Sequence, residues 1–71
     1  MVDENAHLAE ANRHIALAER LIGEQRVRIL EIEEVGGDLV EAERLLKNLN
    51  DTLEQLLIHR RMIIEAGGKE T

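Results

Sequence analysis

The chain contains 71 residues and has no proline, cysteine, tryptophan, tyrosine or phenylalanine. It also has no serine, so Thr52 and Thr71 carry its only side-chain hydroxyls. Disulfides, thiolate nucleophiles and cysteine-based metal sites are therefore excluded. The formal net charge of −6 and the lack of aromatic rings argue against nucleic acid as a partner, because phosphate binding needs cations and single-strand binding uses aromatic stacking.

The balance of 44% hydrophobic and 34% charged residues suits one folded domain spanning residues 1–71. The longest uninterrupted apolar run is Ile15–Ala18, far shorter than the roughly 20 residues that a membrane-spanning helix needs. The amino-terminal residues 1–5 are acidic where a secretory signal would be basic, and no apolar stretch follows them. We therefore expect a cytoplasmic protein that does not bind membranes.

The first predicted helix covers about residues 3–35. Apolar or small residues recur there at alternating steps of three and four, the spacing of a heptad seam. Gln25 is the one polar member of this seam, and it either pairs with another buried polar group and fixes register or lies at the edge with its amide in water. The seam positions are Leu8, Ala11, Ile15, Ala18, Ile22, Gln25, Ile29 and Ile32.

A turn is predicted at residues 36–38. A glycine there can adopt the left-handed conformation that ends a helix, and Asp38 can cap the next helix, with Glu41 completing a capping box. The second helix is expected over about residues 39–66, followed by a flexible tail over residues 67–71 that begins with Gly67 and Gly68. Its seam positions are Leu39, Ala42, Leu46, Leu49, Leu53, Leu56, Arg60 and Ile63.

So short a connection predicts an all-α antiparallel two-helix hairpin. In that hairpin Leu49 should lie at the level of Gln25, and Arg60 at the level of His14. Further apolar side chains lie beside both seams, at Leu17, Leu21, Val27, Leu30, Val35, Val40, Leu45, Leu57, Ile58, Met62 and Ile64.

A single hairpin would leave these side chains wet, so we expect two copies to form a homodimeric four-helix bundle. A stripe of small residues at Ala9, Ala16 and Gly23 either admits another backbone or reflects the helix preference of alanine. The expected dimer core consists of Leu8, Ile15, Ile22, Ile29, Leu46, Leu49, Leu53, Leu56 and Ile63.

The net charge is concentrated in residues 31–43, which contain six acidic and no basic side chains. This acidic tip either docks a basic partner, such as the end of a second copy that carries Arg13 and residues 59–61, or keeps the bundle soluble. Glu24 with Arg28, and Glu43 with Lys47, have the spacing of helical ion pairs. The tip residues are Glu31, Glu33, Glu34, Asp38, Glu41 and Glu43.

The histidines are the only residues suited to site chemistry, and we expect no cofactor and no enzymatic activity. The hairpin should bring His59 near His14, which lies two turns from His7. Glu4 and His7 have a Glu-x-x-His spacing found in di-iron bundles, and Glu10 lies one turn before His14. A metal site could therefore use His7, His14, His59, Glu4 and Glu10. A phosphotransfer role would resemble the dimerisation domains of kinases, but no histidine here precedes the expected acidic residue and proline.

The chain also resembles a group of short bacterial proteins that are built as single helical hairpins. The resemblance covers nearly the whole chain and involves residues 7–11, 13–16, 18–22, 25–26, 36–38, 45–46, 52–53 and 59–60. That group has no established activity, so the resemblance supports the hairpin alone.

The favoured hypothesis is a non-enzymatic protein–protein interaction or structural module that acts as a homodimer and binds another protein through its tip or an outer apolar stripe. The alternatives are the small metal-binding or phosphotransfer bundle and an RNA-binding hairpin dimer, which the negative charge disfavours.

Overall fold

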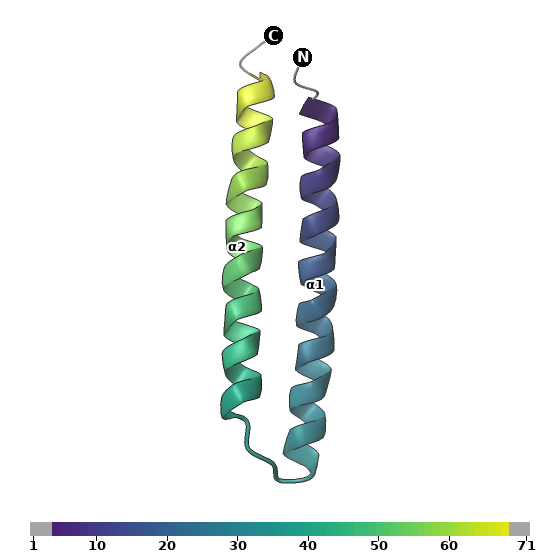
Figure 1. Ribbon diagram of the computed structural model, residues 1–71, viewed down its shortest axis with the longest axis vertical. Helices are drawn as coiled ribbons and strands as arrows, with labels where there is room; N and C mark the ends of the chain where they lie inside the picture. Colours follow the sequence, from purple (N-terminus) through teal and green to yellow (C-terminus); the bar gives the residue numbers. More distant parts are fainter. Residues whose placement is uncertain (1–3, 69–71) are drawn as a thin grey trace.

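The computed structural model describes residues 4–68 and shows two helices that pack side by side as an antiparallel hairpin (Figure 1). Helix α1 spans Glu4–Glu34 and helix α2 spans Val40–Gly68. Together they form a rod with dimensions of 56 × 14 × 14 Å. The predicted all-helical hairpin is therefore confirmed. Neither helix of the described residues 4–68 has the length and apolar character that crossing a membrane requires.

Helix α2 continues beyond its predicted end at residue 66. Gly67 and Gly68 are helical, so their predicted role as a stop is wrong. Gly67 is half-buried and borders a hollow with Asn5 and Leu8 of helix α1. Packing against helix α1 at this level offsets the roughly 1 kcal/mol that a helical glycine costs. The rest of the predicted tail, residues 69–71, lies outside the described residues.

Helix α1 ends in a Schellman motif, in which a left-handed residue closes the last turn. Gly36 supplies that conformation with a φ of 70°. Its amide donates a hydrogen bond to the carbonyl of Glu33 at 3.1 Å, and the amide of Gly37 donates one to the carbonyl of Ile32 at 2.9 Å. A Cβ atom on Gly37 would lie 2.8 Å from Cγ2 of Ile32. Both glycines are therefore required by the local geometry.

Helix α2 begins with the predicted cap. Oδ1 of Asp38 accepts a hydrogen bond from the amide of Val40 at 2.9 Å, which satisfies one of the free donors at the helix start. The predicted capping box is only half present. The carboxylate of Glu41 accepts a hydrogen bond from Arg44 at 3.1 Å and pairs forward along the helix instead.

The two helices meet along the predicted seams. Among the described side chains, the buried ones are Ala11, Ile15, Ala18, Ile22 and Gln25, all on helix α1. The remaining seam residues of helix α1 are half-buried, and so is every predicted seam residue of helix α2. The residues expected in the dimer core thus all lie in the seam of one hairpin. Most of them remain partly accessible to water.

The rod exposes a large surface for its mass. Its accessible area is 5679 Å², whereas a compact monomer of 8.1 kDa exposes about 4,500 Å². Its radius of gyration is 16.5 Å, compared with about 11 Å for a compact domain of this length. Two long helices in contact along a single line account for both differences.

Two of the exposed glycines, Gly36 and Gly23, allow a matched test. Gly36→Ala should lower the free energy of unfolding by about 1 kcal/mol, because alanine is strained at positive φ. Gly23→Ala should raise it by about 1 kcal/mol, because a Cβ there meets no atom within 4 Å. Urea unfolding followed by circular dichroism at one protein concentration would measure both. Destabilisation by Gly23→Ala would show that another backbone approaches the small-residue stripe.

A charge placed in the seam should unfold the hairpin. Ile22 is 6% exposed, so Ile22→Asp buries an unpaired carboxylate and should cost about 4 kcal/mol, with loss of most of the helical circular dichroism signal. Leu30→Asp, at a side chain that is 60% exposed, is the matched control and should retain the signal. Retention of helicity by Ile22→Asp would contradict the seam as the source of stability.

Candidate functional site

Among the described residues whose hydrogen-bond partners are identified, Gln25 makes the only side-chain hydrogen bond that joins the two helices. The residue is 8% exposed, and its Nε2 donates to the carbonyl of Ala42 at 2.9 Å. The alternative with the amide in water is therefore wrong. The partner is the backbone in the first turn of helix α2, which heptad spacing alone could not identify. This bond fixes the height of helix α2 against helix α1.

A first hollow lies beside the seam toward the chain ends. It has a volume of ≈ 340 Å³ and is lined by His7, Glu10, Ala11, His14, His59 and Ile63. The predicted proximity of His14 and His59 is thus confirmed. All three histidines are exposed. Among the side chains that the structure describes, no three histidines or acids are grouped so as to hold a metal ion, and the side chain of Glu4 lies outside that part.

A second hollow lies beside the seam nearer the connection. It has a volume of ≈ 450 Å³ and is lined by Leu21, Glu24, Gln25, Arg28, Glu31, Leu45 and Leu49. Gln25 and Leu49 border the same hollow, but Gln25 bonds the carbonyl of Ala42, seven residues before Leu49, so the predicted match in height is not confirmed. His7 and Leu21 differ by two heptads, as do Leu45 and His59, so the two hollows open on the same flank of the hairpin.

We call this flank face A. Its residues follow alternating steps of three and four on each helix, which is the spacing of a heptad seam, and every one of them is exposed. On helix α1 they are His7, Glu10, His14, Leu17, Leu21, Glu24, Arg28 and Glu31, and on helix α2 they are Leu45, Asn48, Thr52, Gln55, His59 and Met62.

We call the opposite flank face B. Asn5 borders a hollow on that side with Leu8, Ile63, Ile64 and Gly67, and heptad spacing adds more polar positions from helix α1. The face B residues are Asn5, Asn12, Glu19 and Arg26 on helix α1, and Glu43, Asn50, Leu57 and Ile64 on helix α2. At these positions next to the seam, apolar side chains occur only toward the carboxyl end of helix α2. One row farther out on the same flank lie Ala9, Ala16, Gly23, Leu30 and Val40.

Two predicted ion pairs have different partners. Glu24 pairs with Arg20 at 3.4 Å rather than with Arg28, and Lys47 pairs with Asp51 at 2.9 Å rather than with Glu43. Each residue has suitable neighbours one turn away in both directions, so spacing alone did not decide between them. Among the described residues, Arg28 has no ion-pair partner in the hairpin.

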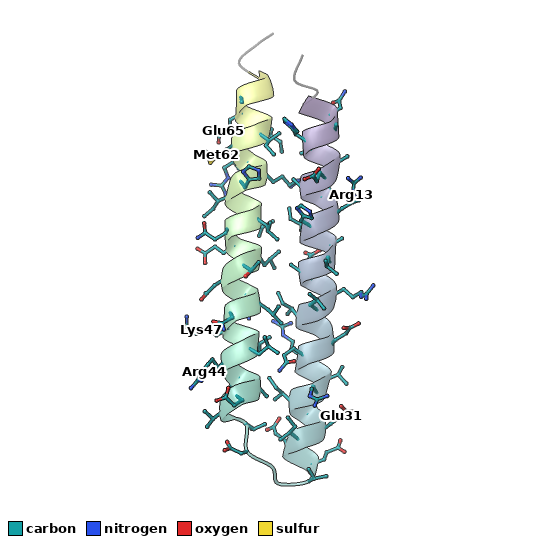
Figure 2. All side chains as sticks on the ribbon, in the orientation of Figure 1. Arg13, Glu31, Arg44, Lys47, Met62 and Glu65 are labelled. Atoms are coloured by element: carbon teal, nitrogen blue, oxygen red, sulfur yellow. The ribbon has the colours of Figure 1, made fainter. Side chains whose placement is uncertain are left out.

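Charge is separated along the rod. All six acidic residues of the tip are exposed, and Figure 2 shows Glu31 near the connection and Arg13 near the opposite end. Glu41 pairs with Arg44 at 3.1 Å. Near the opposite end, Nε of Arg60 is buried and has no hydrogen-bond partner within the described chain. The acidic side chains thus dominate only at the connection, whereas the opposite end mixes arginines with acidic residues.

Many large apolar side chains are exposed on the described rod. They include Leu17 at 49%, Leu21 at 37% and Leu45 at 47% on face A. Met62 at 61% also belongs to face A, and Figure 2 shows it directed away from helix α1. The other positions lie on the remaining surfaces of the rod. The full set is Leu17, Leu21, Val27, Leu30, Val35, Val40, Leu45, Leu57, Ile58, Met62 and Ile64, which confirms the predicted surplus of apolar surface.

Comparison with protein-family models, with curated protein sequences and with solved structures finds no match to this chain. The resemblance to short helical-hairpin proteins therefore stays a prediction.

Replacement of Gln25 by an isosteric acid tests the cross-helix bond. Gln25→Glu places a carboxylate against the carbonyl of Ala42, so the free energy of unfolding at pH 7 should fall by about 2 kcal/mol. Burial raises the pKa of such a carboxyl, so the deficit relative to wild type should shrink as the pH falls and the group becomes a donor. Urea unfolding at pH 7 and pH 4 would measure this. Asn50→Asp, an amide-to-acid change at an exposed position outside face A, is the control and should show no such deficit.

Proposed function

We propose that the protein is a non-enzymatic interaction module that acts as a homodimer, in which two hairpins form a four-helix bundle. The observation that carries the proposal is the row of large exposed apolar side chains beside a seam that buries little. Water contact with such surface is unfavourable by ~25 cal/mol per Å². A second copy has the same exposed apolar surface. Pairing of the two copies would remove the apolar surface of both from water.

The area agrees with this proposal. The hairpin exposes 5679 Å², which exceeds the value for a compact monomer by about 1,200 Å². A stable interface of standard size buries about 800 Å² from each partner. The half-buried leucines of helix α2 would complete the core of such a bundle.

The surface chemistry favours an interaction role over catalysis. Both hollows of face A are bordered by exposed side chains, whereas substrate pockets enclose most of a ligand. The acidic tip would remain available for a basic protein partner at Glu33, Glu34 and Glu43, which lie outside face A.

Sedimentation equilibrium at micromolar concentrations tests the proposal directly. The expected mass is twice the 8.1 kDa of the chain, and dilution should reduce helicity and mass together because folding and association are linked. A compact, fully helical monomer throughout this range would contradict the proposed function.

A further inference from the structure

We propose that the two hairpins pair head-to-tail through face A, with helix α1 against helix α1 of the second copy and the connections at opposite ends. This inference rests on the proposed dimer and specifies its interface. It is based on a pattern of complementary residues along face A, on the concentration of acidic residues at the connection and on the position of the two hollows.

The residues of face A on helix α1 are self-complementary about the level of Glu19, which is the midpoint of Glu4–Glu34. When two such helices overlap fully and run in opposite directions, residues at equal distances from Glu19 face each other. Leu17 then meets Leu21 of the second copy, and Glu10 meets Arg28. The imidazole of His14 meets the carboxylate of Glu24, and that of His7 meets Glu31.

These pairs also fit the packing of antiparallel helices. One set of face A positions, at residues 7, 14, 21 and 28, repeats every heptad, and so does the other, at residues 10, 17, 24 and 31. Each proposed pair joins one member of the first set to one of the second. Such mixed layers are the expected arrangement when two heptad seams run in opposite directions.

Helix α2 has a similar complementary pattern about its own midpoint. Its face A residues pair about a level close to the midpoint of Val40–Gly68. Leu45 then meets Met62 of the second copy, which joins two apolar side chains. Asn48 meets His59, and Thr52 meets Gln55, so polar side chains meet groups with which they can form hydrogen bonds.

The hollows agree with this arrangement. The hollow lined by histidines and the hollow lined by Leu21, Arg28 and Leu45 lie on opposite sides of the Glu19 level. Head-to-tail pairing therefore places each hollow opposite the other kind. Arg28 and Glu10, which have no ion-pair partner among the described residues of one hairpin, would gain one from the second copy.

The alternative dimer, in which both connections lie at the same end, is disfavoured by charge. We call it the same-end arrangement. A two-fold axis along the rod would place helix α1 against helix α2 of the second copy at equal height. His14 would then lie beside His59, since both border the first hollow. Glu31 would lie beside Glu41, which borders a further hollow that shares Gln25, Arg28 and Leu45 with the second one. It would also crowd both acidic tips at one end, whereas head-to-tail pairing keeps them apart.

Face B is a poorer interface for the same symmetric pairing. There Glu19 would meet Glu19 of the second copy, which places like charges together at the centre. Asn12 would meet Arg26, and no apolar pair would form among the face B positions of helix α1 that adjoin the seam. Face A is therefore the surface that the residues favour.

Disulfide trapping tests the geometry, because the chain has no cysteine of its own. Single variants His14→Cys and Glu24→Cys, at exposed positions, would be mixed and oxidised. The mixed disulfide should form about tenfold faster than either homodisulfide, because pairing raises the effective concentration of the two thiols. Mass spectrometry distinguishes the three products.

Two further mixtures serve as matched controls. Asn12→Cys with Arg26→Cys has the same spacing about Glu19 on face B, and His14→Cys with His59→Cys would be trapped by the same-end arrangement. Neither should form a mixed disulfide faster than its homodisulfides. Rapid trapping in either control, or no preference in the first mixture, would overturn the head-to-tail arrangement through face A.

Charge exchange gives a second readout without cysteine. Arg28→Glu and Glu10→Arg should each raise the dissociation constant of the dimer about tenfold, because each creates two like-charge contacts in the symmetric pair. The double variant restores opposite charges and should return the constant toward that of wild type. Arg26→Glu, outside face A, is the control and should leave it unchanged.

Sedimentation of each variant separates the two proposals. A wild-type monomer would refute the homodimer itself. A wild-type dimer in which the double variant shows no rescue would retain the homodimer and overturn the proposed pairing.

Discussion

The structure depends on one line of contact between two helices. A hairpin of two long helices can bury only the residues that face the partner helix, and here the buried side chains are confined to helix α1. The small side chains of Ala11 and Ala18 on helix α1 allow helix α2 to approach. The leucines of helix α2 lie against this surface without becoming fully buried. Every outer flank of the rod remains accessible to water. The exposed leucines, the large surface area and the expected need for a second copy all follow from this geometry.

The polar features fix where the two helices lie against each other. Gly36 and Gly37 end helix α1 within a few residues, and Asp38 starts helix α2 at a defined position. Gln25 then binds the carbonyl of Ala42 inside the seam. A buried amide without a partner would be costly, so a shift of either helix along the other is penalised. The connection and Gln25 therefore specify the register, which apolar heptads alone would specify weakly.

The sequence predicted the seam well because heptad spacing and burial have the same period. It located Gly36 and Asp38 correctly because positive φ and helix capping each require particular residue types. It failed where several neighbours compete, as for Glu24 and Lys47, and where packing outweighs propensity, as for Gly67. The flank on which the two hollows open could be identified only when the relative rotation of the two helices was known. Spacing shows which residues share a side of one helix, but it could not show which sides of the two helices adjoin in one flank.

Helix α1 begins, and helix α2 finishes, at the same end of the rod, opposite the connection (Figure 1). Any protein segment fused to either terminus would therefore leave from one pole of the hairpin. If two hairpins lie in opposite directions, such segments leave from the two poles of the assembly, separated by about the 56 Å length of the rod. The pair would then act as a stiff spacer, holding two identical attachments at a set distance and facing apart.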